Sequence, residues 1–138
     1  MTTLWNKLNL KEDQEIVVIN APTSFAAALK ALPRGCVKQR ISAIKELTFV
    51  LVFVERKSEL DKVSAAVIEK VAGDAILWFA YPKATSKRFA CDFNRDTGWD
   101  VLRASGFDTV RQVAIDEDWS ALRFRRTEFI NHRHYNRE

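Results

Sequence analysis

The stretch LTFVLVFV, residues 47–54, is the longest apolar run of the chain and predicts the central strand of its fold. Thr48 alone interrupts the run, whose β-branched and aromatic side chains are typical of a strand inside a sheet. The charged residues Glu55, Arg56 and Lys57 follow at once. The run is therefore far too short for a membrane span, which needs roughly 20 apolar residues.

Strands and helices alternate around this stretch. Residues 16–19, IVVI, predict a strand buried on both faces, and residues 75–80 predict a further apolar strand. A helix of about two to three turns is expected over residues 22–32. Another helix is expected to begin at Ser58, its N-cap, and to stop at Gly73. This alternation indicates an α/β fold.

The C-terminal part of the chain predicts a helix followed by a hairpin. Apolar residues from Trp99 to Leu102, ahead of Gly106, predict the helix. Residues 110–115 and 120–126 alternate apolar and polar side chains, and the acidic residues 116–118 form a turn between them. We therefore expect the sheet to close with an antiparallel hairpin.

Strands that alternate with helices imply a mostly parallel sheet in three layers, because right-handed crossovers place helices on both faces. A short half-exposed strand at residues 37–41 brings the expected total to about six strands. In such sheets ligands bind beyond the carboxyl ends of the strands, where the winding reverses. Those ends lie at residues 20–24, 55–58 and 81–95.

Length and composition predict one folded domain. The 138 residues are 47% hydrophobic and 29% charged, which is typical of a globular chain of ordinary domain size. We expect a single α/β domain over residues 1–130 and a flexible basic tail over residues 131–138. The N-terminus is charged where a signal peptide is apolar, and Cys36 and Cys91 lack metal-ligand spacing. A cytoplasmic protein is therefore expected.

The first candidate site is the loop after residues 75–80, which is rich in basic and hydroxyl side chains. Backbone N–H groups at a strand-to-helix junction favour an anion. We predict that a phosphate or carboxylate ligand binds where this loop meets the turn after residues 16–19. The predicted ligand-binding residues are Asn20, Thr23, Lys83, Ser86, Lys87 and Arg95. In the alternative interpretation the loop is solvated, and Asp92 or Asn94 simply caps the next helix.

A second candidate site is a basic segment in the first third of the chain. No acidic residue occurs between Ile16 and Lys45. The basic residues of this segment are Lys30, Arg34, Lys38, Arg40 and Lys45. Such a patch contacts nucleic-acid phosphates without sequence preference, and the alternative is a solvated face.

Residues suited to acid–base or metal chemistry are scarce. Both histidines, His132 and His134, lie in the expected tail, which removes the commonest general base from the folded part. The acidic residues 116–118 fit a turn better than a catalytic cluster. We therefore predict no catalytic residue and no metal site.

Three segments carry a resemblance to known proteins: INAP at residues 19–22, ILWFAYPK at 76–83 and RQVAIDEDWSALRFR at 111–125. They resemble a family of small bacterial proteins defined only as a domain of unknown function, over about residues 8–126. The order of elements is also similar to a shortened class I methyltransferase fold. That resemblance implies a sheet in the order 2-1-3-4-6-5, with the last strand antiparallel and inserted beside the fourth.

One departure from the methyltransferase pattern bears on function. A glycine-rich turn follows the first strand in such enzymes, because S-adenosylmethionine needs close approach to the backbone there. Residues 20–24 are instead Asn-Ala-Pro-Thr-Ser. No acidic residue stands near Arg40, Ile41 and Ser42, at the end of the second strand, to hold a ribose. We therefore expect no cofactor.

The leading hypothesis is a non-enzymatic binding domain on a degenerate methyltransferase-like scaffold. It would recognise a small anionic ligand or a protein partner. The alternative is an S-adenosylmethionine-dependent methyltransferase with an altered cofactor loop. A second alternative is weak, non-specific binding of nucleic acid through the basic segment.

Overall fold

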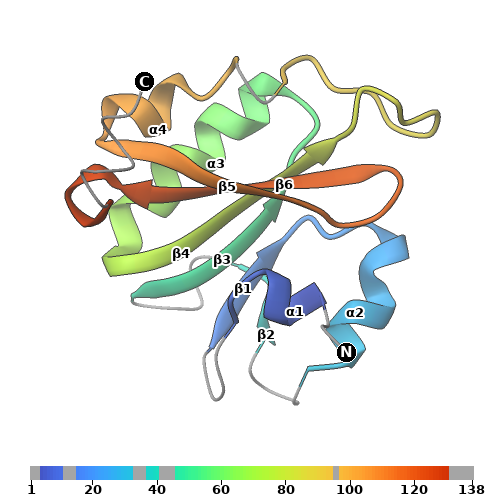
Figure 1. Ribbon diagram of the computed structural model, residues 1–138, viewed down its shortest axis with the longest axis horizontal. Coiled ribbons are helices and arrows are strands. Elements are labelled where there is room, and N and C mark those ends of the chain that lie inside the picture. The colour runs from blue at the N-terminus through green and yellow to red at the C-terminus, as the bar shows by residue number, and fades with distance from the viewer. Residues whose placement is uncertain (1–3, 11–14, 33–36, 41–45, 95–96, 131–138) are drawn as a thin grey trace.

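In the computed structural model, the chain folds into a twisted sheet with helices on both faces (Figure 1). The structure describes residues 4–10, 15–32, 37–40, 46–94 and 97–130. The sheet has six strands in the order β2-β1-β3-β4-β6-β5, which confirms the order that the resemblance implied. The strands are β1 (Ile16–Ile19), β2 (Val37–Lys38), β3 (Leu47–Phe53), β4 (Val71–Pro82), β5 (Phe107–Ala114) and β6 (Trp119–Arg126).

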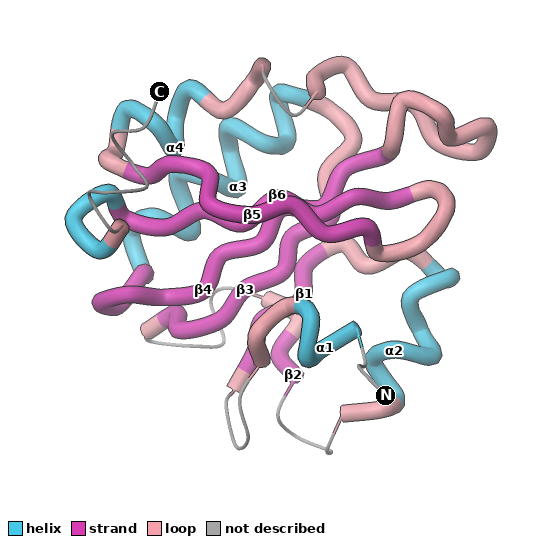
Figure 2. Tube along the Cα trace, in the orientation of Figure 1, coloured by secondary structure: helices cyan, strands magenta, loops and turns pink. Residues whose placement is uncertain are grey.

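The helices form the outer two of three layers. Figure 2 shows α3 and α4 on one face of the sheet and α1 and α2 on the other. The helical segments are α1 (Leu4–Lys7), α2 (Ala26–Lys30), α3 (Lys57–Lys70), α4 (Asp100–Ala104) and the 3₁₀ helices η1 (Thr23–Phe25) and η3 (Thr127–Phe129). The α/β prediction is confirmed: β1 to β4 are parallel, and β6 is antiparallel to both β4 and β5.

Strand β3 is buried on both faces, which explains the continuous apolar run in its sequence. Val50 and Val52 pack into one hydrophobic cluster together with residues of α3 and α4. Phe49, Leu51 and Phe53 pack into a second cluster with residues of α1 and Phe25. The alternation of side chains along a strand therefore supplies the core of both faces.

The N-terminus of α3 differs from the prediction. The helix begins at Lys57 and its N-cap is Arg56, so Ser58 lies inside the first turn. Arg56 makes no side-chain cap. Instead, the backbone N–H of Lys57 donates to Oδ1 of Asp92 at 2.6 Å. A carboxylate from a distant loop thus replaces the local cap that was expected at Ser58.

The C-terminus of α3 also differs from the prediction. The helix ends at Lys70, and β4 begins directly at Val71, well before its expected start at residue 75. Val71 pairs with Leu47, and its β-branched side chain favours a strand. Gly73, the expected helix stop, lies inside β4 with a φ of +55°. The pairing of β3 with β4 shifts register after Leu47, and a glycine suits such an irregularity.

In the part of the chain that the structure describes, no helix is long and apolar enough to cross a membrane. The expected tail, residues 131–138, lies outside the described residues. The strand expected over residues 37–41 is shorter in the structure, because β2 covers only Val37–Lys38.

Candidate functional site

Strands β1 to β5 all end at one edge of the sheet, which we call the carboxyl edge. β1, β3 and β4 are mutually parallel, and β5 runs with them because both β4 and β5 are antiparallel to β6. The turn at Asn20, the segment beginning at Glu55, the loop of residues 83–94 and the hairpin turn of residues 115–118 follow these ends. This is the edge where ligands bind in open α/β sheets.

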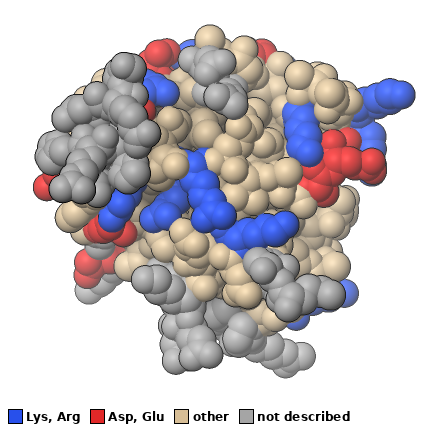
Figure 3. Space-filling view, in the orientation of Figure 1, with Lys and Arg blue, Asp and Glu red and all other residues tan. Residues whose placement is uncertain are grey.

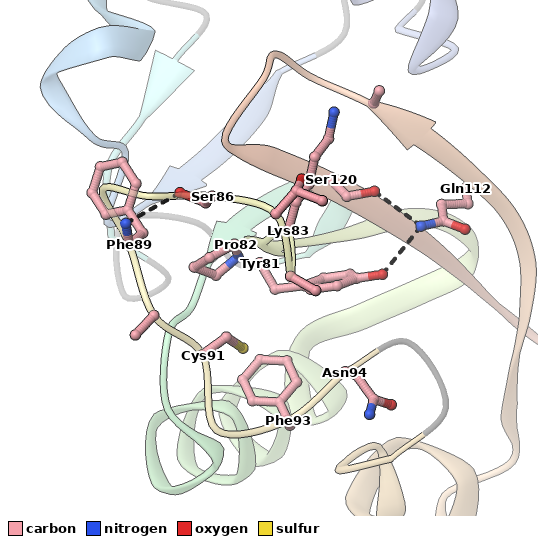
Figure 4. Close-up of a pocket in the computed structure, with 14 residues that line it drawn as sticks. Tyr81, Pro82, Lys83, Ser86, Phe89, Cys91, Phe93, Asn94, Gln112 and Ser120 are labelled. Carbon is pink, nitrogen blue, oxygen red and sulfur yellow. Dashed lines mark hydrogen bonds between the residues drawn. The ribbon is translucent and has the colours of Figure 1, made fainter.

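A cavity of about 970 Å³ opens at this edge beside β4, β6 and β5, and loop 83–94 forms its other wall (Figure 4). We call it the carboxyl-edge cavity. It is lined by Tyr81, Pro82, Lys83, Ala84, Thr85, Ser86, Phe89, Ala90, Cys91, Phe93, Asn94, Gln112, Ala114 and Ser120.

Three polar side chains from three strands form the sheet side of this cavity. The amide Nε2 of Gln112 donates hydrogen bonds to the Tyr81 hydroxyl at 3.2 Å and to the Ser120 hydroxyl at 3.0 Å (Figure 4). Tyr81 and Ser120 are buried cross-strand partners on β4 and β6. The ring of Tyr81 also lies 5.9 Å from that of Phe93. The wall therefore combines aromatic surface with a fixed polar network.

Asp118 of the hairpin turn holds the first part of loop 83–94. The Ser86 hydroxyl donates to Oδ1 of Asp118 at 2.9 Å, and the Arg88 guanidinium lies 3.8 Å from Oδ2. The backbone N–H of Lys83 donates to the Asp118 carbonyl at 2.8 Å. The Asp118 side chain is only 12% exposed, so this carboxylate is well placed to fix the loop.

The far end of the loop docks on the start of α3. Besides capping Lys57, Asp92 donates its backbone N–H to the Glu55 carbonyl at 3.3 Å. A smaller cavity of about 240 Å³ is lined by Glu55, Arg56, Ala90, Cys91 and Asp92. Ala90 and Cys91 line both cavities, so this part of the loop is the wall between them.

The thiol of Cys91 is not activated in this wall. Burial raises its pKa above the ordinary value, and the nearby charges of Asp92 and Glu55 raise the pKa further, against a backbone hydrogen bond from Phe93 that lowers it. A raised pKa keeps the thiol protonated at neutral pH, which is the opposite of what a nucleophilic cysteine needs.

Two predicted ligand-binding residues, Lys83 and Ser86, line the carboxyl-edge cavity. Ser86 already donates to Asp118, and Figure 4 shows Lys83 extending away from Cys91 and Phe93. The lining does not include Asn20, Thr23 or Lys87, and Arg95 lies outside the described residues. The structure therefore does not bring the predicted set together in this cavity.

The polar residues Tyr81, Gln112 and Ser120 were missed by sequence reasoning. For Gln112 and Ser120 the sequence signal was a polar side chain among the alternating residues of the last two strands, and for Tyr81 it was the end of the apolar run of β4. The expected capping role of Asp92 is corrected as well: Asp92 caps the preceding helix α3, not the next one. Asn94 instead accepts a hydrogen bond from the N–H of Thr97 at 3.0 Å.

The basic segment is described only in part. Lys30 and Arg40 are exposed, whereas Lys38 lies 3.8 Å from the carboxylate of Glu15. Arg34 and Lys45 lie outside the described residues. Within the described residues, no group of His, Cys, Asp and Glu side chains is arranged to hold a metal ion.

The turn after β1 has an unusual backbone. Asn20 adopts a φ of +60°, in the left-handed region that glycine usually occupies. Ile19 pairs with Val52, so Asn20 and Glu55 leave neighbouring parallel strands at the carboxyl edge. β1 connects outward to β2 on one side, while β3 leads to β4 on the other. Asn20 and Glu55 therefore flank the point where the strand order reverses.

No family model matches the sequence, and no curated protein matches it either. Solved structures match the fold. The N-methyltransferase NodS from Bradyrhizobium japonicum WM9 is 20% identical and has a TM-score of 0.50, with 81% of this chain and 73% of that chain covered. Magnesium protoporphyrin IX methyltransferase (ChlM) from Synechocystis PCC 6803 is 10% identical with a TM-score of 0.54, covering 82% and 74%.

An S-adenosylmethionine-dependent methyltransferase from Clostridium acetobutylicum ATCC 824 is 7% identical with a TM-score of 0.51, covering 88% of this chain and 87% of that chain. Identities this low identify a shared fold and nothing more. The chain has a methyltransferase-like, Rossmann-like α/β fold.

Proposed function

We propose that this chain is an S-adenosylmethionine-dependent methyltransferase that acts on a small acceptor in the carboxyl-edge cavity. The observation that carries the proposal is the left-handed turn at Asn20, which together with Glu55 flanks the point where the strand order reverses. The fold shared with S-adenosylmethionine-dependent methyltransferases supports this function more directly than a non-enzymatic role. The cofactor would supply the methyl group.

The turn after β1 lacks glycine, but Asn20 gives it the backbone conformation that a glycine would provide. Asparagine enters the left-handed region more readily than most residues, so the backbone turns at Asn20 as it would at a glycine. The N–H groups of such a turn are suited to the cofactor carboxylate. The exposed carboxylate of Glu55, on the neighbouring strand end, suits its ammonium group. These residues would hold the amino-acid end of the cofactor.

The carboxyl-edge cavity would hold the acceptor. Phe89, Phe93 and Tyr81 offer aromatic surface, and the Gln112 network offers fixed donors and acceptors. An acceptor with a flat apolar body and one polar group fits this lining. Methyl transfer needs chiefly the alignment of two reactants, so positioning by this wall can supply much of the rate.

The proposal is tested by calorimetric titration with S-adenosylmethionine and S-adenosylhomocysteine. We expect both to bind. Glu55→Gln should weaken binding roughly tenfold or more, because a charge-assisted hydrogen bond contributes about 1.5–3 kcal/mol. Glu69→Gln, an exposed change on α3 far from the carboxyl edge in sequence, is the matched control and should bind normally. Absence of binding at millimolar cofactor would overturn the proposal.

A second candidate function is ligand binding without methyl transfer, which retains the small anionic ligand or protein partner of the leading hypothesis. It is favoured by Pro22, which has no N–H to offer a cofactor, and by the absence of a carboxylate on the described residues 37–40. A thermal-shift screen separates the two candidates. Stabilisation by metabolites with none by S-adenosylmethionine would favour this second function.

A further inference from the structure

Arginines gather on the face of the sheet that packs against α1. Arg111 of β5 and Arg123 of β6 are direct cross-strand partners, and Arg125 lies two positions along β6 on the same face. Lys and Arg side chains form a continuous group over β5 and β6 near the centre of this face (Figure 3). Like charges directly opposite each other destabilise an antiparallel pair. A functional role would explain why Arg111 and Arg123 lie directly opposite each other.

A β-bulge aims Arg111 at this face. The register between β5 and β6 shifts between Thr109 and Arg111, so Val110 is the extra residue. Phe107, before the shift, packs in the cluster on the α3 side, whereas Val113, after it, packs in the cluster on the α1 side. Without the shift, Arg111 would point with Phe107 to the α3 side. Bulges are a common device for redirecting a functional side chain.

Arg123 carries a buried donor without a partner. Its Nε atom is inaccessible to solvent and makes no hydrogen bond within the described residues. Burial lowers the pKa of Arg123, and the charges of Arg125 and Arg111 lower it further, against the attraction of Asp74. In the free protein, the Arg123 guanidinium is therefore partly buried, and its Nε donor is unsatisfied. A ligand anion that contacts the guanidinium would compensate its charge, and it would satisfy Nε once the side chain turns toward the ligand.

A concave site lies at this position. A cavity of about 580 Å³, which we call the basic cavity, is lined by Asn6, Asn9, Leu10, Asp74, Ile76, Arg123 and Arg125. Both oxygens of Asp74 accept hydrogen bonds from Arg125, at 2.8 and 2.6 Å, so this one carboxylate stands beside two guanidinium groups. The amides of Asn6 and Asn9 add neutral donors to the rim.

We propose that Arg123, which lines the basic cavity, binds a phosphate group of a small phosphorylated ligand there, with its cross-strand partner Arg111 beside the cavity. The planar guanidinium of Arg123 carries its donors in the fork geometry that matches phosphate oxygens. Arg111 supplies the second positive charge from the neighbouring strand. The basic cavity lies on the α1 face, away from the carboxyl-edge cavity, so the inference does not depend on the proposed methyl transfer.

The experiment is an NMR titration of the full chain with inorganic phosphate, at constant ionic strength maintained with chloride. The side-chain Nε–H signal of Arg123 is observed. We expect this signal to shift saturably with phosphate and not with chloride. Arg111→Gln should weaken phosphate binding about tenfold, because it removes one charge from the site. A signal that does not move, or that moves without saturation, would overturn the proposal.

Arg126→Gln is the matched control, because it removes a charge from β6 on the opposite face, where Arg126 lies over the Phe107 ring at 5.0 Å. Its phosphate affinity should equal that of the unmodified chain. If Arg126→Gln and Arg111→Gln weaken phosphate binding equally, the loss of affinity reflects net charge alone, and the proposed site is overturned. Arg111 is exposed, so its replacement leaves the core intact. Tight binding of a single-stranded oligonucleotide that phosphate does not displace would also overturn a small-ligand site.

Discussion

The two halves of the carboxyl edge are filled differently. Beside β1 and β3 the chain turns sharply at Asn20, and Phe25 packs on Phe53 with ring centroids 4.9 Å apart. Beside β4, β6 and β5 the long loop 83–94 arches outward and leaves a cavity of about 970 Å³. Open α/β folds place a ligand at the reversal of strand order, whereas the carboxyl-edge cavity of this chain lies farther along the edge.

Trp119 is the residue that joins the two halves. Its ring lies 5.2 Å from that of Phe53, below the reversal point, and 5.1 Å from that of Phe89 in the cavity loop. It is 2% exposed. A change at Trp119 therefore tests whether the halves form one unit.

Among the variants that test the two halves of the edge, Trp119→Ala should have the largest effect on stability. It removes the shared ring, and we expect the free energy of unfolding to fall by about 3–5 kcal/mol. Urea denaturation followed by circular dichroism measures the loss. If both halves depend on Trp119, hydrogen exchange should accelerate at the Asn20 turn and in loop 83–94 together. Acceleration confined to one of them would show that the halves are independent.

Two conservative variants sharpen this test. Nε1 of Trp119 is buried and has no hydrogen-bond partner within the described residues, so Trp119→Phe removes an unsatisfied donor. Nε1 of Trp99 donates to the Asn94 carbonyl at 2.9 Å. We therefore expect Trp99→Phe to cost about 1 kcal/mol more than Trp119→Phe. The reverse order would contradict these hydrogen-bond assignments.

Asp118→Ala should loosen the cavity half alone. It removes the acceptor of Ser86 and the partner of Arg88, and we expect a loss of about 1–3 kcal/mol in the free energy of unfolding. Hydrogen exchange should accelerate in loop 83–94 and stay unchanged at the Asn20 turn. Glu117→Ala, at an exposed neighbour, is the control. Equal exchange rates in the two variants would mean that Asp118 does not hold the loop.

Sequence reasoning succeeds where a local pattern determines the structure. The apolar run at residues 47–54 is visible without knowing the fold, because β3 is buried on both faces. It fails where the partner is remote. Asp92 caps a helix that starts 35 residues earlier, so Ser58 was the only cap that a local rule could find. Tyr81, Gln112 and Ser120 meet only through strand register.

At Asn20 the lack of glycine and the backbone conformation point in different directions. The absence of glycines predicts no cofactor turn, whereas the backbone at Asn20 has the left-handed φ that a glycine would supply. A cofactor turn requires a left-handed backbone conformation, and glycine is only the residue that most often adopts it. Asparagine is enriched in this region, so the residue type itself was the available signal.

Asn20→Ala should therefore lower the free energy of unfolding by about 1 kcal/mol, because alanine is strained at a φ of +60°. Asn20→Gly should leave stability nearly unchanged and preserve binding of S-adenosylmethionine. Asn9 has a φ of 65° away from the carboxyl edge, so Asn9→Ala is a control with similar strain. Calorimetry should show weakened cofactor binding for Asn20→Ala and not for Asn9→Ala. Equal affinities would separate the Asn20 turn from the cofactor.

The smallest expected effect concerns Cys91, in the wall between the two cavities. Because its pKa is raised, chiefly by burial, its alkylation by iodoacetamide in a Cys36→Ser background should be slow at neutral pH and should keep accelerating above the ordinary thiol pKa. The stability that the neutral thiol contributes is complete below the ordinary pKa and is lost as pH rises through the raised one.

The carboxylate of Glu55 is one cause of the raised pKa of Cys91, so its removal should act in a known direction. Glu55→Gln removes a negative charge that disfavours the thiolate, which lowers the pKa of Cys91. Alkylation at neutral pH should then be faster by about twofold, since an exposed charge is largely screened by solvent. Bound ligands test both halves of the edge. S-adenosylmethionine bound beside Glu55 should protect Cys91 from alkylation. An acceptor bound in the carboxyl-edge cavity should do the same. Protection by an acceptor alone would place the only ligand in the cavity half, and the Asn20 half would then be a structural turn.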